Sequence, residues 1–226
     1  MLVEDRALRS DALERRAFLK CLTLGVFPHV HEHKALGWDA VTMDSVARRA
    51  RLSRALVYVY FKDKQDLHFA IAARALEVLR QRFTEATARA RTGMDKVEAC
   101  GRAYMAYAQE FPHFFDACAR LETYAHDGNT EPSPQAAQCI NCGKGVHDVV
   151  VEALVTGQRD GTIRGEIGDL QVVSRVLWGF MHGLIQIAIN KGEPLAQVGI
   201  SVQQLAQQAL WLIRQGLTCG ANGSKG

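Results

Sequence analysis

Two kinds of pattern are almost absent from this sequence of 226 residues. Alternation of polar and apolar residues, which marks half-buried strands, hardly occurs, so a β-rich fold is excluded. The longest apolar run, residues 176–189, is too short to span a membrane and contains His182 and Gln186. The sequence also starts with polar residues that do not fit a signal peptide. We therefore expect a cytoplasmic protein without a membrane partner.

The sequence also lacks the common signatures of catalysis. It has no Ser/His/Asp arrangement, no glycine-rich phosphate loop and no paired carboxylates placed for acid–base chemistry. We therefore expect a protein that is not an enzyme and that needs no cofactor or metal.

One cysteine pair keeps an alternative open. Cys139 and Cys142 form a CxxC motif, which can bind zinc together with a second ligand pair or form a reactive disulfide. There is no second CxxC, His147 is the only further ligand nearby, and the strand–helix context of a thioredoxin-like site is missing. The alternative is a thiol oxidoreductase, or a redox or metal sensor, that uses these two cysteines.

What the sequence does contain is a helical pattern and enough apolar residues for a core. Hydrophobic residues make up 48% and charged residues 23%, which is ordinary for a soluble protein. The length suits one small and one medium domain. Apolar residues recur at helical spacing from Leu67 onward. We expect helices over residues 67–91, ended by Gly93, then over 97–109, from Pro112, and over 136–160, 170–191 and 198–216, with a loop at 125–134.

The most informative stretch is residues 42–67, TMDSVARRARLSRALVYVYFKDKQDL. Thr42 can cap the start of a helix that ends near Arg51, and Ser53 can cap a second helix directly after it. Asp63 is placed to cap a third. Two short helices joined by a tight turn are what a chain needs to lay one helix in the major groove of DNA.

Basic residues are concentrated in the same stretch. From Asp44 to Lys64 there are six Lys or Arg against two Asp, a net charge of +4, whereas the whole chain carries +3. Such a run on its own would be an ordinary solvated helix face. Together with the helix-turn-helix spacing it favours a polyanionic partner.

The segment DAVTMDSVARRARLSRALVYVYFKDKQDL resembles the N-terminal signature of the TetR family of transcriptional regulators. The family pattern is a Thr before the first helix of the motif, a Ser-Lys/Arg-Gly/Ala turn, an aromatic run ending in Phe-Lys, and a Lys before the long fourth helix. This sequence supplies these parts in register at Thr42, Ser53-Arg54-Ala55, Tyr58-Val59-Tyr60-Phe61-Lys62 and Lys64.

The resemblance clearly covers residues 37–73 and rests beyond them on chain length and helical content. It implies an all-α fold with an N-terminal three-helix helix-turn-helix DNA-binding domain, residues 10–68. A C-terminal helical effector-binding and dimerisation domain would occupy residues 69–219, and residues 220–226 would be a disordered tail. Residues 177–184 also resemble the helix that many members carry near the dimer interface.

The function implied by the resemblance is that of a ligand-responsive regulator, which we expect to be a repressor. It would bind a palindromic operator in double-stranded DNA as a homodimer and be released by a small hydrophobic or aromatic effector. The last two long helices would form the dimer surface as part of a four-helix bundle.

The resemblance also assigns the DNA contacts. Thr42 and Lys64 would contact phosphates from helix N-termini. Arg54 would reach either a guanine edge or a phosphate, and the sequence leaves both open. Leu56 and Val59 replace a small polar and an aromatic residue of the usual pattern, so we expect an operator unlike those of well-matched relatives. The residues expected to contact DNA are Thr42, Ser53, Arg54, Ala55, Leu56, Tyr58, Tyr60 and Lys64.

Aromatic residues of the C-terminal part would line the effector pocket, although each is also compatible with an ordinary core position. Apolar walls with few polar groups suit a hydrophobic or aromatic molecule. The residues expected there are Tyr104, Tyr107, Phe111, Phe115, Tyr124, Trp178 and His182.

The region before the motif departs from the family pattern. Pro28 should break or kink the first helix, so we expect an irregular helix or a short insertion before Gly37. Histidines alternate at His29, His31 and His33, and imidazole is a common metal ligand. Because no further ligands are apparent nearby, we expect an exposed polar loop rather than a metal site.

Overall fold

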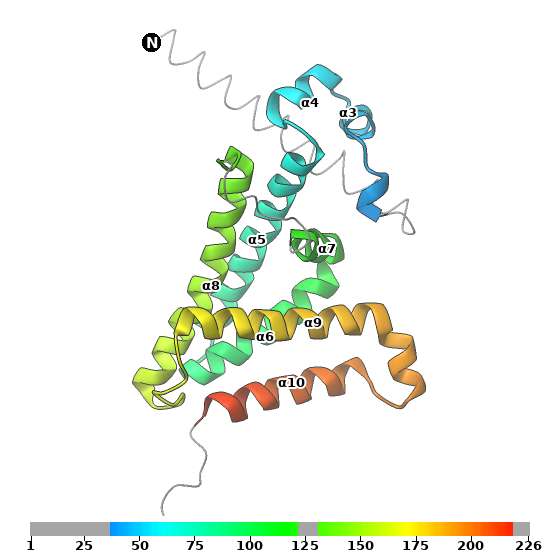
Figure 1. Ribbon diagram of the computed structural model, residues 1–226. Coiled ribbons are helices and arrows are strands. Elements are labelled where there is room, and N and C mark those ends of the chain that lie inside the picture. Colours follow the sequence, from blue (N-terminus) through cyan, green and yellow to red (C-terminus); the bar gives the residue numbers. More distant parts are fainter. Residues whose placement is uncertain (1–36, 122–130, 219–226) are drawn as a thin grey trace, which may run out of the picture. The chain divides into compact units, whose positions relative to one another are not determined.

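The computed structural model describes residues 37–121 and 131–218 of the chain (Figure 1). Within these residues all regular structure is helical and no strand occurs, so the expectation of an all-α fold is confirmed. The irregular first helix, the histidines at 29, 31 and 33, Tyr124 and the tail all lie outside the described residues. The elements are the 3-10 helix η2 (Gly37–Ala40) and the helices α3 (Met43–Ala50), α4 (Arg54–Tyr60), α5 (Lys64–Ala88), α6 (Gly93–Glu110), α7 (Pro112–Leu121), α8 (Pro134–Asp160), α9 (Leu170–Gln197) and α10 (Val202–Leu217).

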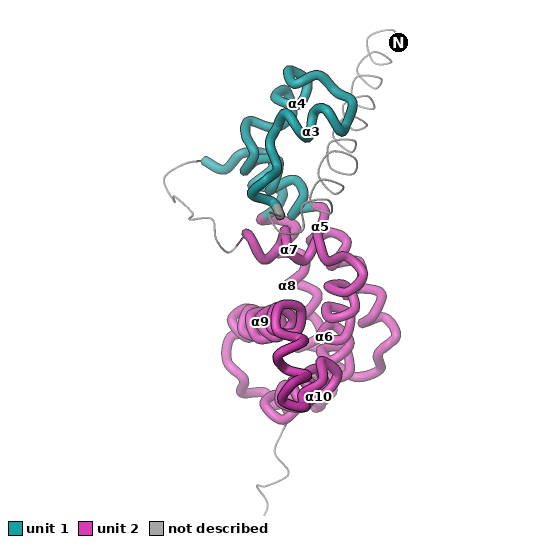
Figure 2. The backbone as a smooth tube through the Cα atoms, turned by 90° about the vertical axis from the view of Figure 1, so that its right-hand side faces the viewer, with its two compact units in different colours: residues 1–73, 124–139 teal, residues 74–123, 140–226 magenta. Residues whose placement is uncertain are grey.

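The described chain divides into two compact units (Figure 2). Unit 1 comprises residues 37–73 and 131–139, and unit 2 comprises residues 74–121 and 140–218. The boundary expected after residue 68 falls inside α5, and the sequence did not indicate that the start of α8 belongs with the N-terminal helices. The continuous helices α5 and α8 each contribute to both units.

Unit 1 begins with two short helices whose ends are fixed by local hydrogen bonds. Thr42 caps α3, because its Oγ1 accepts from the backbone N of Ser45 at 3.1 Å and Ser45 Oγ accepts from Thr42 N at 3.0 Å. Arg51 ends α3 in the left-handed conformation, with a φ of 54°. Ser53 Oγ accepts from Leu56 N at 3.1 Å and starts α4. The caps predicted at Thr42 and Ser53 and the helix end near Arg51 are confirmed.

The buried faces of α3 and α4 pack against each other and form the core of this part of unit 1. Val46, Val57 and Phe61 are fully buried. Asp63 Oδ1 then accepts from Asp66 N at 2.8 Å, so Asp63 caps α5 as predicted. Among the described residues of α4, Arg54, Ala55, Tyr58 and Val59 are exposed.

We expected Gly93 to end a helix, but it begins α6. Helix α5 stops at Ala88, and Thr92 caps α6 by accepting from Asp95 N at 3.2 Å. A Cβ on residue 93 would lie 1.9 Å from the backbone N of Gly157 in α8. Gly93 is therefore required for the close approach of two helices. The prediction was wrong because this approach depends on a residue that is distant in sequence.

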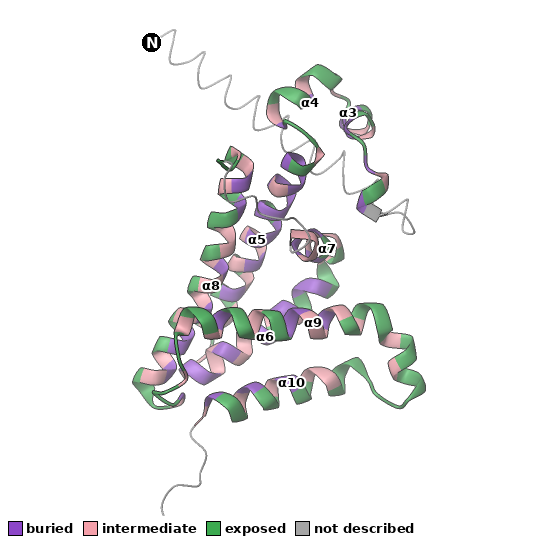
Figure 3. Cartoon of the chain, in the orientation of Figure 1, coloured by how far each residue is buried: buried purple, intermediate pink, exposed green. Residues whose placement is uncertain are grey.

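Within unit 2, α6 packs against α7, α9 and α10. Arg214 of α10 forms ion pairs with Glu98 and, at 3.4 Å, with Asp95, which join α10 to α6. Both carboxyl groups have a lowered pKa: at Asp95 the largest cause is a hydrogen bond from Thr92, with Arg214 adding to it, and at Glu98 the bonds from Arg214 and Arg102 outweigh the effect of burial. Figure 3 shows that α9 and α10 bury residues along one side and expose the other.

Helix α9 continues beyond its predicted end. It runs to Gln197, but the backbone at Lys191 is not helical, with φ −126° and ψ 17°. The cause is Pro194, which lacks an N–H and whose ring clashes with the carbonyl four residues earlier. The predicted end at residue 191 thus coincides with a break, after which a short further helical segment follows.

Apolar residues are exposed along α9. The helix is long and apolar enough to cross a membrane by length and composition, and 22% of its most apolar 18-residue window is buried. A single helix of this kind does not indicate a membrane protein. Its exposed apolar residues are spaced as one stripe, namely Val172, Val176, Phe180 and Ile187.

Candidate nucleic-acid interface and ligand cavity

The outer face of α4 is exposed. Val57 faces the core and is fully buried, whereas Tyr58 is 43% and Val59 73% exposed. This division follows from helical spacing, because a single buried position leaves the neighbouring ones at the surface. Of the residues expected to contact DNA, the exposed ones are Thr42, Ser53, Arg54, Ala55 and Tyr58, and those of intermediate exposure are Leu56, Tyr60 and Lys64.

Arg54 is held at the surface of α4 by two neighbours. Its Nε lies 3.1 Å from Asp44 Oδ1, and its Nη1 donates to Asp44 Oδ2 at 3.4 Å. Its guanidinium carbon is 5.5 Å from the centre of the Tyr58 ring. Since exposed ion pairs contribute at most about 1 kcal/mol, Arg54 can exchange Asp44 for a phosphate or a base edge.

Lys64 stands at the first position of α5 and reaches back to η2. Its Nζ donates to the carbonyl of Asp39 at 3.1 Å and lies 5.2 Å from the centre of the Trp38 ring. These contacts fix the ammonium group close to the start of the helix-turn-helix. An ammonium in this place suits a phosphate contact that positions the protein without reading sequence.

A contact that the sequence did not indicate joins the start of α8 to the end of α4. Gln135 Nε2 donates to the carbonyl of Tyr60 at 2.9 Å. Ser133 Oγ donates to Asp66 Oδ1 at 2.5 Å and accepts from Ala136 N at 3.1 Å, so Ser133 also caps α8. The Ser-Pro pair at 133–134 is a recognisable helix start. Its partner Asp66 is far away in sequence and could not be predicted.

Asp66 is the centre of this contact. It is 6% exposed, and its second oxygen accepts from the backbone N of Lys62 at 3.2 Å. The carboxylate therefore binds both the turn that follows α4 and the residue that caps α8. We call Asp66, Ser133 and Gln135, with the Tyr60 carbonyl, the α4–α8 contact.

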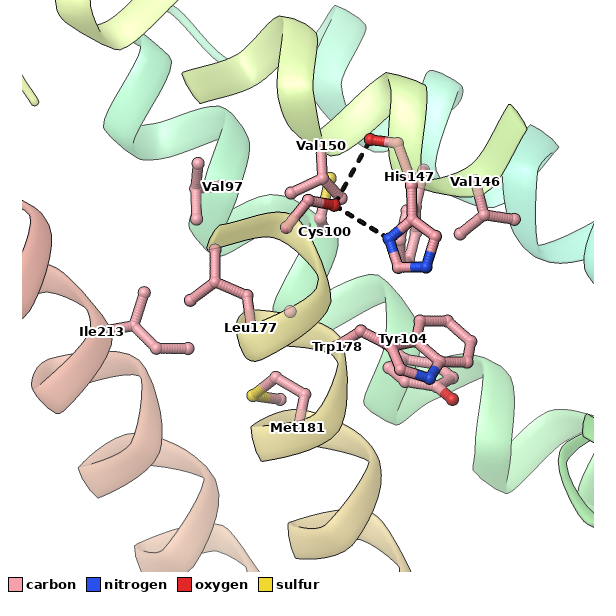
Figure 4. A pocket seen from close by; sticks show the side chains of 13 residues that line it. Val97, Cys100, Tyr104, Val146, His147, Val150, Leu177, Trp178, Met181 and Ile213 are labelled. Carbon is pink, nitrogen blue, oxygen red and sulfur yellow. Dashed lines mark hydrogen bonds between the residues drawn. The ribbon is translucent and has the colours of Figure 1, made fainter. Parts of the chain in front are cut away.

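Unit 2 contains a cavity whose wall is built by α6, α8, α9 and α10 with one residue of α5 (Figure 4). Its volume is only about 40 Å³. The cavity is therefore narrow, and an organic molecule would have to widen it. The wall consists of Phe83, Val97, Cys100, Gly101, Tyr104, Val146, His147, Val150, Ser174, Leu177, Trp178, Met181 and Ile213.

Two of the residues expected to bind the effector line this cavity. The rings of Tyr104 and Trp178 are stacked, with centroids 4.7 Å apart and planes 23° apart. Phe115 and His182 are not in the wall but lie next to it: their rings are stacked at 4.7 Å, and His182 Nδ1 is 2.6 Å from the Tyr104 hydroxyl. Burial lowers the pKa of His182.

The other expected effector residues lie elsewhere. The Tyr107 hydroxyl donates to the carbonyl of Ala75 at 2.9 Å, which ties α6 to α5. Phe111 is next to Phe114, with ring centroids 5.8 Å apart. Tyr124 lies outside the described residues. An aromatic residue in an apolar stripe can serve the core or a cavity equally well, so composition alone could not separate these positions.

His147 and Ser174 are polar residues of the cavity wall that we had not assigned to the effector site. His147 Nδ1 is 2.9 Å from Ser174 Oγ, and the imidazole stands edge-on to Trp178 at 5.7 Å (Figure 4). Burial lowers the pKa of His147, and the nearby Arg175 lowers it further while Asp148 acts in the opposite direction. The imidazole is therefore neutral at pH 7. A lone His in an amphipathic helix carries no sequence signal that would place it in a cavity.

The Cys142 thiol of the CxxC motif is not activated. Cys139 is buried and Cys142 is half-buried. Burial raises the pKa of Cys142, with Glu77 adding to the effect and Arg80 opposing it. A nucleophilic or metal-binding thiolate requires a lowered pKa. In the part of the chain that the structure describes, no group of three or more His, Cys, Asp or Glu could hold a metal. The geometry does not support the redox or metal alternative.

Sequence comparison identifies the segment around α3 and α4. The model of the bacterial regulatory proteins of the tetR family matches residues 31–71. A comparison with curated protein sequences gives no match.

Solved structures share the fold over most of the chain. The fatty acid degradation regulator FadR of Bacillus halodurans has a TM-score of 0.62 and 14% identity, over 90% of this chain and 98% of that one. The TetR family regulator PfmR of Thermus thermophilus has a TM-score of 0.61 and 18% identity, over 84% of this chain and 97% of its own.

The ketosteroid transcriptional regulator KstR2 of Mycobacterium tuberculosis has a TM-score of 0.61 and 17% identity, over 91% of this chain and 96% of its own. At such identities the likeness concerns the fold. The family match over the helix-turn-helix and the fold shared with TetR-family regulators over most of the chain make this protein similar to TetR-family transcriptional regulators.

Proposed function

We propose that this regulator is a repressor that binds a palindromic operator as a homodimer and leaves it when a small, mainly apolar molecule enters the cavity of unit 2. The observation that carries the proposal is the exposed face of α4, on which Arg54 and Tyr58 lie beside the capped ends of two helices. A short exposed helix directly after a tight turn has the geometry of one that enters the major groove.

The dimer is supported by the exposed apolar stripe of α9. Val176 is 63% and Val172 59% exposed, and α10 adds Trp211 at 54%. Apolar surface of this kind is covered in a stable protein, and a two-fold partner would cover it with the same face of a second copy. Two copies would place two α4 helices on half-sites about one helical turn of DNA apart.

The response to a ligand is supported by the cavity and by two of the structural neighbours. FadR of Bacillus subtilis was solved in complex with stearoyl-CoA, and KstR2 is named as a ketosteroid regulator. Both names concern molecules with large apolar parts. The apolar wall of the cavity suits a ligand with a similar apolar part.

A route from cavity to α4 is supported by α8. Its first turn takes part in the α4–α8 contact, and further along the same helix Val146, His147 and Val150 line the cavity. An α-helix is stiff over this length, so a ligand that pushes against its middle can shift its beginning. We propose that a bound ligand acts on α4 through the α4–α8 contact.

The experiment that tests this function is selection of bound fragments from randomised DNA by the purified protein, at a stated salt concentration. An inverted repeat with half-sites about one helical turn apart is the expected result. Enrichment of no sequence, with salt-sensitive background binding alone, would contradict the proposal.

A further inference from the structure

The wall of the cavity carries no charge at neutral pH. None of its residues is Asp, Glu, Lys or Arg. Burial raises the pKa of Cys100 to about 12, so that its thiol stays protonated, and burial keeps His147 neutral. An ionised ligand would lose its hydration here without gaining an opposite charge, which is strongly unfavourable. The wall therefore selects an uncharged ligand.

The shape of the wall favours a ring. The stacked Tyr104 and Trp178 present flat surfaces, and the His147 ring stands across from Trp178 at an interplanar angle of 61° (Figure 4). Flat and edge-on aromatic surfaces pair well with a further ring system. Met181, a flexible side chain in the wall, can move aside to widen the narrow space.

The polar atoms of the wall fix one end of such a molecule. The Tyr104 hydroxyl is engaged with His182, and Ser174 Oγ with His147 Nδ1. Within the described residues no hydrogen bond reaches His147 Nε2, the ring nitrogen other than the Nδ1 that contacts Ser174. A hydroxyl group can donate and accept, so it can pair with either neutral tautomer of this imidazole.

We propose that the cavity takes an uncharged, mainly apolar ring compound that carries a hydroxyl group bound by His147 Nε2. This inference rests on the proposed function, in that it names the ligand class to which the regulator responds. His147 is then the residue that determines specificity, and the aromatic and aliphatic wall provides most of the affinity.

The test is calorimetric titration of the purified full chain with three compounds that share one ring system: 2-naphthol, naphthalene and 2-naphthoate. We expect 2-naphthol to bind about 2- to 10-fold more tightly than naphthalene, as for one neutral hydrogen bond. 2-Naphthoate, which is ionised at pH 7, should bind at least about 10-fold more weakly than 2-naphthol.

Variants connect the preference to His147. His147→Phe should abolish the difference between 2-naphthol and naphthalene, whereas His147→Gln, which keeps a hydrogen-bonding side chain, should retain it. Glu152→Gln on the exposed side of α8 is the control and should behave as the original chain. An unchanged preference in His147→Phe, or tighter binding of 2-naphthoate than of 2-naphthol, would overturn the proposal.

The outcome is separable from that of the proposed function, because the titrations contain no DNA. If the protein selects an operator but binds none of the three compounds, the ligand class is wrong and the regulator proposal stands. If it binds 2-naphthol with the expected preference and selects no operator, the ligand class stands and the regulator proposal fails.

Discussion

Among the residues proposed to contact DNA, Arg54 has neighbours that the structure defines closely. In the free protein its charge is shared with Asp44 at 3.1 Å, on an exposed surface where that pair contributes little. Arg54→Ala should weaken operator binding by about 1–3 kcal/mol and relax the preference at one base pair if Arg54 reads a base. Binding measured by fluorescence anisotropy on the selected operator and its single-base variants checks this.

The matched control is Arg159→Ala, which removes the same charge from an exposed position near the end of α8. It should leave operator affinity within a few tenths of a kcal/mol, as surface substitutions usually do. An equal loss from Arg54→Ala on all operator variants would show that Arg54 contacts a phosphate only. No loss at all would remove Arg54 from the interface.

At the scale of helices, the α4–α8 contact should contribute to the free energy of unfolding. Ser133→Ala removes the cap of α8 and leaves Asp66 Oδ1 without its donor. We expect the free energy of unfolding to fall by about 2–3 kcal/mol, measured by urea denaturation followed by circular dichroism.

Ser201→Ala provides the comparison, because Ser201 caps α10 in the same way but its hydrogen bonds stay within the first turn. It should cost only about 1 kcal/mol. Operator affinity should fall in Ser133→Ala and not in Ser201→Ala. Equal effects of the two substitutions on both stability and DNA binding would show that Ser133 acts as a helix cap alone.

Helix starts were predictable from the sequence where the stabilising contact is local. The caps at Thr42, Ser53 and Asp63 each bind a backbone N–H three residues ahead, and the residue types alone indicate this. Gly93 was assigned wrongly because its partner, Gly157, is distant in sequence. A glycine can mark the end of a helix or a point where two helices approach closely, and only the fold shows which of the two applies.

The candidate sites also differ in whether they depend on local contacts or on contacts between residues distant in sequence. The exposed face of α4 follows from the spacing within one short helix, so its residues could be named in advance. The cavity brings together α6, α8 and α9, and of the aromatic residues expected there the structure places Tyr104 and Trp178 in the wall. His147 and Ser174, which meet across two helices, gave no local signal. Asp66 and Ser133 were missed for the same reason.

For the whole molecule, the proposed dimer would link the exposed stripe of α9 to DNA binding. Val176 stands in the middle of the stripe and is 63% exposed. Val176→Glu should leave the fold of the single chain intact, because the side chain touches water there, but it would place two charges in an apolar dimer interface. We expect the variant to elute as a monomer when its mass is measured by light scattering after gel filtration.

The same substitution should weaken binding to the full operator far more than binding to one half-site. In a dimer, binding of one DNA-binding domain raises the effective concentration of the other at its half-site, and a monomer lacks this gain. Gln171→Glu introduces the same charge at an exposed position of α9 outside the stripe and should remain dimeric. If Val176→Glu stays dimeric and binds the operator normally, the two copies meet through another surface. The two α4 helices would then be held apart by different elements, and a dimer built on α9 and α10 would be wrong.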